Sequence, residues 1–226
     1  MKTLTWQKPG QQNVAQELIK IIINYVAELR INNSLQEHGG DMAIGAYGII
    51  NRLLTLYVMI VLGLTMGMQP IVGYNFGAQK IDRVKQTLKL GIISGVVITS
   101  SGFLICEFFP HAVSAVFTDS DELIGLAVDG LRLTVLMFPF VGAQIVIGNF
   151  FQSIGKVKIS IFLSLTRQLL YLLPCLLLFP HWWGLKGIWI SLPVSDSLAF
   201  ITAVISLMIY IKKVSKEHPI ADKVAE

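Results

Sequence analysis

The chain has 226 residues, of which 54% are Ala, Val, Ile, Leu, Met, Phe, Trp, Tyr or Cys and only 14% are charged, with a formal net charge of +4. A soluble domain carries about 25% charged residues, so this composition excludes a water-soluble globular domain. It also excludes a disordered chain, which combines low hydrophobicity with high net charge. The remaining class is a membrane-embedded protein, and the lipid bilayer is its first expected partner.

Residues 1–31 predict a polar N-terminus followed by an amphipathic helix. Apolar side chains recur at helical spacing over residues 14–29, but Glu17, Lys20, Glu28 and Arg30 interrupt them. A central Arg, Lys or Asp in a membrane helix costs roughly 2.5–3.5 kcal/mol. We therefore expect this helix to lie on the membrane or against the bundle, and not to cross the bilayer as a lipid-exposed span.

Five long apolar runs follow, and each is long enough to cross a hydrocarbon core, which takes about 20 residues of helix. The ten-residue alternation of β-barrel strands is not visible. We expect an all-α membrane protein, a polytopic transmembrane helix bundle with five clear spans plus the N-terminal amphipathic helix. The expected spans are residues 42–74, 89–109, 124–153, 159–179 and 187–211, within a bundle of residues 32–211 that a tail of residues 212–226 follows.

Basic residues gather in alternate loops of this bundle. Ten of them lie after the first expected span, after the third, and in the tail after the fifth. They are Lys80, Arg83, Lys85, Lys89, Lys156, Lys158, Lys212, Lys213, Lys216 and Lys223. The intervening loops hold only Lys186. Because cytoplasmic loops carry the excess of Lys and Arg, we expect a multi-pass protein of the cell membrane with a cytoplasmic C-terminus. The positive net charge then needs no nucleic-acid partner.

Ionisable residues inside spans are costly, so each is a candidate for function. Arg52 and Asp196 lie at similar expected depths, about 16 and 14 Å from the outer end at 1.5 Å per residue. We expect Asp196 to pair mainly with Arg52, on the substrate or ion pathway or as a purely structural pair, with Arg167 as the less favoured structural partner. Asp129 and Arg132 are three residues apart near a helix end and predict a solvated local pair.

Uncharged polar residues mark a possible pathway through the bundle. The candidates for a substrate or ion pathway are Gln69, Asn75, Gln144, Asn149 and Gln152, of which Gln69 and Gln144 lie close to internal prolines. Proline-broken helices often line a cavity in transporters, although the same residues also occur as ordinary core filling. Gly63 and Gly67, like Gly91 and Gly95, match the small-xxx-small pattern of close helix packing. The sequence has no HExxH motif and no Walker-type glycine loop, so we expect no enzyme, no metal site and no cofactor.

Three motifs carry a family resemblance. They are GMQPIVGYNFGAQ at residues 67–79, NNSLQEHGGDMAIGAYGIINR at residues 32–52 and GNFFQSIGKVKIS at residues 148–160. Together they resemble the multidrug and toxic compound extrusion (MATE) transporters, over about residues 32–211. The resemblance implies a twelve-helix fold of two six-helix lobes, of which this chain is similar to the second. The five clear spans are then helices eight to twelve, and the amphipathic segment is a degenerate or truncated helix seven.

The resemblance also implies a function. Members export cationic organic compounds in exchange for H⁺ or Na⁺, so the expected activity is cation-coupled multidrug efflux by a partial or truncated chain. An N-terminal lobe or a second copy would complete such a transporter. Two alternatives stay open: a membrane scaffold or assembly remnant without transport, and a lipid-linked oligosaccharide flippase of the related superfamily.

Overall fold

The computed structural model describes the backbone of residues 9–217 and the side chains of Leu18 and of residues 21–213. The first eight residues and the end of the expected tail lie outside the described residues. Over the described backbone the chain is helical and contains no strand. The elements are α1 (Pro9–Gly77), α2 (Ile81–Phe108), α3 (Pro110–Ala115), α4 (Asp121–Thr134), the 3₁₀ segment η1 (Val135–Met137), α5 (Phe138–Ser153), α6 (Val157–Leu165), the π-helical segment η2 (Thr166–Leu172) and α7 (Leu173–Glu217).

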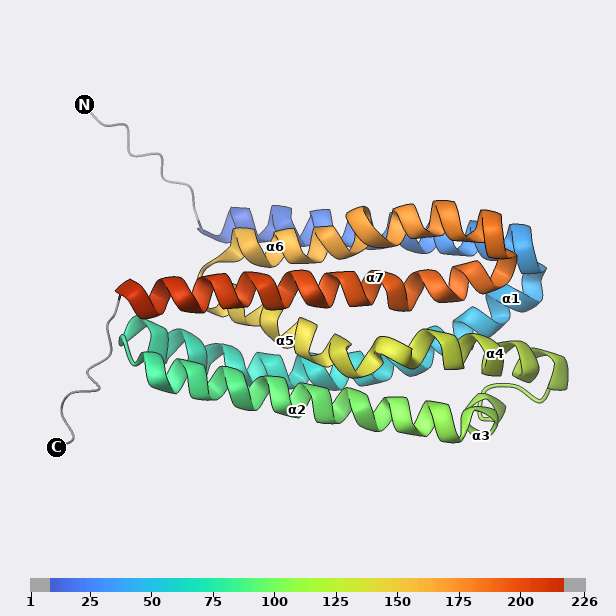
Figure 1. Ribbon diagram of the computed structural model, residues 1–226, viewed down its shortest axis with the longest axis horizontal. Coiled ribbons are helices and arrows are strands. Elements are labelled where there is room, and N and C mark those ends of the chain that lie inside the picture. The colour runs from blue at the N-terminus through green and yellow to red at the C-terminus, as the bar shows by residue number, and fades with distance from the viewer. Residues whose placement is uncertain (1–8, 218–226) are drawn as a thin grey trace, which may run out of the picture.

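Both long helices reverse direction at a glycine. Gly40 has φ 63° and ψ −161°, and Gly184 has φ 55° and ψ −134°. Glycine populates positive φ readily because it has no Cβ. Figure 1 shows that α1 turns back at one end of the bundle, and that the run from α6 into α7 turns back at the same end. Each of these helices therefore contributes two antiparallel arms.

Four stretches among the described residues are long and apolar enough to cross a membrane: Ile21–Gly77, Ile81–Phe108, Asp121–Ser153 and Val157–Lys213. The first and last have 57 residues each, about 85 Å of straight helix at 1.5 Å per residue, against a hydrocarbon core of about 30 Å. Because these two stretches fold back at Gly40 and Gly184, the described residues form a bundle of six arms. The expected transmembrane helix bundle is confirmed, with one arm more than the five clear spans.

The additional arm is the N-terminal one, residues 9–39. Ala27, Ile31 and Leu35 are buried in the hydrophobic core together with residues of the other arms. The opposite face carries exposed apolar side chains such as Ile21 and Tyr25. Of the two expected positions for this helix, the one against the bundle is correct.

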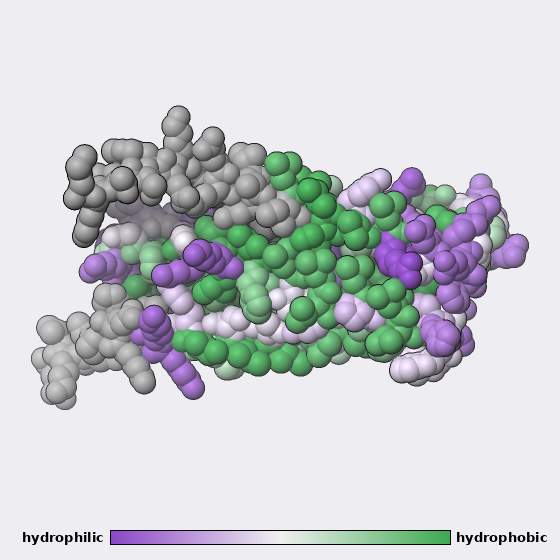
Figure 2. All heavy atoms as spheres, turned by 90° about the horizontal axis from the view of Figure 1, so that it is seen from above, coloured by the Kyte–Doolittle hydropathy of each residue, from purple (hydrophilic) through white to green (hydrophobic). Residues whose placement is uncertain are grey.

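The surface is divided along the long axis of the bundle. Figure 2 shows a broad apolar belt between two hydrophilic ends. The α1–α2 and α5–α6 turns lie at one end together with the end of α7, while α3 and the reversals of the two long helices lie at the other (Figure 1). Trp182 and Trp183, which are exposed beside Gly184, occupy the position of an interfacial aromatic girdle.

Close packing of α2 on α5 holds the middle of the bundle together. A Cβ added to Gly142 would overlap the carbonyl oxygen of Gly95, and one added to Gly95 would lie 3.0 Å from the carbonyl oxygen of Gly142. The buried Thr99 hydroxyl donates to the Gly95 carbonyl at 2.9 Å or to the Pro139 carbonyl at 3.0 Å. The two helices therefore touch backbone to backbone.

The glycine pairs at four-residue spacing differ in their surroundings. Gly91 and Gly95 are buried at this contact, as the pattern predicts. Gly63 and Gly67 on α1 are exposed, and a Cβ added to either would meet nothing within 4 Å. Their side of α1 faces away from the other described arms, so the packing that the pattern predicts for this second pair has no partner among the described residues.

Candidate functional site

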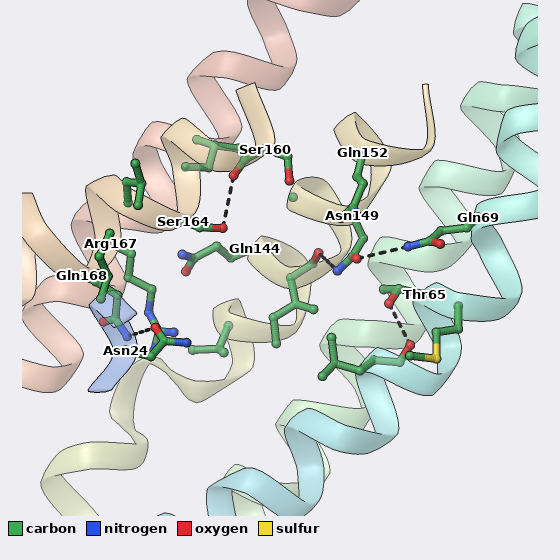
Figure 3. A pocket seen from close by; sticks show the side chains of 18 residues that line it. Asn24, Thr65, Gln69, Gln144, Asn149, Gln152, Ser160, Ser164, Arg167 and Gln168 are labelled. Carbon is green, nitrogen blue, oxygen red and sulfur yellow. Dashed lines mark hydrogen bonds between the residues drawn. The ribbon is translucent and has the colours of Figure 1, made fainter. Parts of the chain in front are cut away.

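A cavity of about 570 Å³ lies between the two arms of α1, α5, α6 and η2. Ten of its lining side chains are polar: Asn24, Thr65, Gln69, Gln144, Asn149, Gln152, Ser160, Ser164, Arg167 and Gln168 (Figure 3). The remaining lining is mainly aliphatic and includes Leu62, Met66 and Ile145. A volume of this size is in the usual range for small-molecule sites, about 300–1,000 Å³.

Helical periodicity places the polar side chains on the cavity wall. On α5, Gln144, Gly148 and Gln152 follow one another at four-residue spacing, so they share one face of the helix. Ser160 and Ser164 do the same on α6, where the Ser164 hydroxyl donates to the Ser160 carbonyl at 3.1 Å. Each helix therefore turns a polar stripe inward while its other faces stay apolar.

Two amides join α1 to α5 at one end of the cavity. The Gln69 amide nitrogen lies 3.4 Å from Oδ1 of Asn149, and the Asn149 amide nitrogen donates to the Ile145 carbonyl at 2.9 Å. Thr65 lies at the same end, where its hydroxyl donates to the Leu62 carbonyl (Figure 3). This end offers neutral hydrogen-bonding groups.

The other end of the cavity holds the charged group. Nε of Arg167 donates to Oδ1 of Asp196 at 2.7 Å, and the side chains are 38% and 12% exposed. Arg167 belongs to η2, and π-helical turns are rare and often found at functional sites. Arg167 lines the cavity, whereas Asp196 on α7 stands behind it.

The expected pairing of Asp196 with Arg52 is wrong. Asp196 pairs with Arg167, and Arg52 is exposed, with no ion pair to Asp196. Depth along the helix was the basis of that prediction, but the direction of a side chain around the helix axis decides which residues meet. Arg167 lies in the π-helical segment η2, and its side chain reaches Asp196 on α7.

The other predicted residues are distributed unevenly. Gln69, Gln144, Asn149 and Gln152 line the cavity together. Asn75 is buried outside it, where its amide donates to the Ile71 carbonyl at 2.8 Å. Asp129 and Arg132 are both exposed on α4, and no ion pair joins them in the described part of the chain.

Five polar lining residues were not among the predicted site residues: Asn24, Thr65, Ser160, Ser164 and Gln168. Gln168 follows Arg167 inside an apolar run, and two adjacent polar residues in such a run indicate that this part of the helix faces the interior of the bundle. Asn24 was missed because its arm was expected at the periphery. The structure joins it to the site, since the Gln168 amide nitrogen donates to Oδ1 of Asn24 at 2.7 Å.

The chemistry of the cavity is that of hydrogen bonding around one guanidinium. Among the described residues, the cavity lining includes no carboxylate, and no group of three His, Cys, Asp or Glu residues could hold a metal ion. Buried amide oxygens of Gln144 and Gln168 have no hydrogen-bond partner. The site can therefore hold a polar organic molecule, whose apolar parts would contact the aliphatic wall.

Comparisons with known proteins agree with this arrangement. The multidrug export protein MepA of Staphylococcus aureus (strain MSSA476) is 27% identical over 183 residues, which are 79% of this chain and 39% of MepA. The solved structure of a ligand complex of the MATE multidrug transporter DinF-BH matches with a TM-score of 0.75 at 34% identity, over 86% of this chain and 44% of that one. A mutant of the Vibrio cholerae MATE transporter VcmN matches with a TM-score of 0.81 over 94% of this chain and 50% of VcmN, and at 18% identity it shows the fold alone.

The chain thus spans at most half the length of each of these relatives. The model of the MatE family matches residues 18–177, which is most of the chain. These residues include α1 from residue 18 onward, the α2–α5 contact and all described residues of the cavity lining. The chain belongs to the MatE family of multidrug efflux transporters.

Proposed function

We propose that this chain is the second lobe of a cation-coupled multidrug exporter, which moves organic compounds out of the cell in exchange for H⁺ or Na⁺. The observation that carries the proposal is the polar cavity of about 570 Å³ inside a six-arm bundle of the MatE family. MepA is a multidrug export protein, and DinF-BH is a multidrug transporter that was solved with a ligand bound. By analogy, cationic organic compounds are the substrates of the assembled transporter.

The proposed partner is an N-terminal lobe or a second copy of this chain. The chain covers 39% of MepA and 44% of DinF-BH, and alternating access in such a fold needs two lobes that move against each other. Exposed Gly63 and Gly67 on α1 support this proposal, because small residues leave room for the close approach of another helix.

The proposed orientation in the cell membrane places the C-terminus in the cytoplasm. The Lys-rich turns after α1 and after α5 lie at the same end of the bundle as the end of α7 (Figure 1). Positive residues accumulate on the cytoplasmic side, so this end is the cytoplasmic one.

Efflux from cells that lack their own exporters tests the function. Cells would express the chain alone, or together with the N-terminal lobe of a MepA-type relative, and would be loaded with ethidium. We expect faster ethidium loss with both lobes, abolished by a protonophore if H⁺ is the coupling ion and by a sodium ionophore if Na⁺ is. Unchanged ethidium loss with both lobes present in the membrane would contradict transport and favour a scaffold.

A matched pair of variants ties the efflux to the cavity. Gln144→Trp places a large ring in the cavity, whereas Leu170→Trp places the same ring on the exposed face of η2. We expect the first variant to block efflux and the second to leave it unchanged at equal membrane levels.

A further inference from the structure

The guanidinium of Arg167 has hydrogen-bonding capacity that the protein does not use. A guanidinium carries five N–H donors, and among the described residues only Nε has a partner, Oδ1 of Asp196. The side chain lines the cavity and is 38% exposed there. The donors at the far end of Arg167 therefore face the cavity.

Asp196 holds Arg167 in this position and does not itself reach the cavity lining. Its side chain is 12% exposed and belongs to α7, behind η2. The carboxylate thus fixes one edge of the planar guanidinium and leaves the opposite edge available. Asp196 is a positioning residue, and Arg167 is the group that a ligand would touch.

The surroundings of Arg167 favour a negative group. Figure 3 shows Gln168 and Asn24 beside Arg167, and Gln144 between this group and the Gln69–Asn149 pair. Glu28 is the acidic residue one helical turn beyond Asn24, and it is exposed and not part of the lining. The described lining residues include no carboxylate, so the guanidinium, whose charge Asp196 balances from behind, is the charged group that a ligand in the cavity would meet.

The side-chain amides of Gln144 and Gln168 add hydrogen-bonding groups beside the charge of Arg167. The buried oxygens of Gln144 and Gln168 lack partners, and each amide group presents a donor on its other atom. An anionic group bound by Arg167 would find donors in these amides, and a neighbouring hydroxyl or amine of the same ligand would find acceptors.

We propose that the cavity binds the carboxylate, or a similar anionic group, of an organic substrate at Arg167. The inference deepens the proposed function, since it names the part of the substrate that this lobe holds. The preferred substrates are then amphoteric molecules, whose cationic part contacts the other lobe and whose acidic part contacts Arg167. Arg binds carboxylates especially well because its planar fork matches both oxygens.

Two dyes that differ in one group test the proposal on the whole purified chain in detergent. Rhodamine 110 carries a free carboxylate, and rhodamine 123 is its methyl ester. A hydrogen bond to a charged group contributes about 1.5–3 kcal/mol, so by fluorescence anisotropy we expect rhodamine 110 to bind about tenfold more tightly. Equal binding, tighter binding of the ester, or no binding of rhodamine 110 by the folded chain would overturn the proposal.

Variants separate this role from a structural one. Arg167→Gln together with Asp196→Asn removes both charges without leaving either one unpaired, and we expect it to abolish the preference for the free acid. Asp196→Asn alone keeps an amide oxygen that can accept the Nε hydrogen bond and hold Arg167 in place. It removes the competing negative charge, so we expect binding of rhodamine 110 to rise about threefold while binding of the ester does not. Arg132→Gln makes the same chemical change at an exposed residue of α4 and serves as control. A preference that persists in the double variant, or falls in Asp196→Asn, refutes the assignment.

The dye-binding test of the Arg167 site and the efflux test of the proposed export can fail independently. Dye binding by the isolated chain requires no transport, so a normal acid preference without ethidium efflux would contradict export and leave the Arg167 site standing. Normal ethidium efflux without a preference for the free acid would contradict the Arg167 site and leave the proposed export standing.

Discussion

Substitution of Gly142 by Ala tests the close packing of α2 on α5. A Cβ at this position would overlap the carbonyl oxygen of Gly95, and it would lie 2.6 Å from the carbonyl carbon of Gly95 and 2.7 Å from Oγ1 of Thr99. Two of the three neighbours are backbone atoms, which cannot move away as the end of a flexible side chain can. The helices must therefore separate, and this also weakens the hydrogen bond between Thr99 and the Pro139 carbonyl.

The expected cost follows from these two effects. Overpacking in a close-packed interior costs typically about 1–3 kcal/mol, and a hydrogen bond between membrane helices contributes about 1 kcal/mol. We expect Gly142→Ala to lower the free energy of unfolding by about 2–4 kcal/mol. Gly148→Ala lies on the same helix, with nothing within 4 Å of its Cβ, and Ala is preferred to Gly in helices, so that variant is neutral or slightly stabilising.

The measurement is equilibrium unfolding by SDS titration from mild detergent micelles, followed by the loss of helical circular dichroism. The unfolding midpoint of Gly142→Ala falls below that of the unchanged chain, while that of Gly148→Ala does not. Equal midpoints for the two variants would refute the backbone contact between α2 and α5.

The same titration checks four further substitutions. Gly184→Ala places a side chain at φ 55° and lowers the free energy of unfolding by about 1–2 kcal/mol; an unchanged midpoint would mean that the turn is built differently. Thr99→Val removes the hydroxyl between α2 and α5 and costs about 1 kcal/mol, and a gain in stability would show that the hydroxyl is not bonded. Asp196→Asn costs about 1–2 kcal/mol, less than the 3–5 kcal/mol of a fully buried pair, because Arg167 is 38% exposed; no change would argue against the ion pair. Gly67→Ala stays within about 0.5 kcal/mol, since no atom lies within 4 Å, and a large loss would place another arm against it.

Hydropathy is sufficient to predict most of this fold. A span is recognised from the hydropathy of about 20 consecutive residues, so single residues matter little. The expected spans 42–74 and 187–211 lie within the second arms of α1 and α7, which begin after Gly40 and Gly184. The sequence predicts the N-terminal arm as an amphipathic helix but not as a span, because its charges are costly only if the helix faces lipid. Its buried face, with Ala27, Ile31 and Leu35, packs on the other arms instead.

The site was predictable only in part, for a geometric reason. Gln69, Gln144, Asn149 and Gln152 stood out as polar residues in apolar spans, and they line one cavity. Which side chains of different helices meet depends on the rotation of each helix about its axis. Neither composition nor depth in the membrane predicts that rotation. The ion pair of Asp196 with Arg167 depends in addition on a π-helical turn, for which the sequence offers no pattern.

The π-helical segment Thr166–Leu172 gives this arm one residue more than a regular helix of the same rise needs, because its hydrogen bonds run from i to i+5. An arm with such a surplus tolerates the loss of one residue without becoming too short for the bilayer. Deletion of the exposed Leu170 would let the segment close into an α-helix and would rotate Arg167 relative to Asp196. Membrane insertion and ligand recognition therefore depend on different features of this arm. The additional residue is not needed to span the bilayer, but it sets the position of Arg167 relative to Asp196.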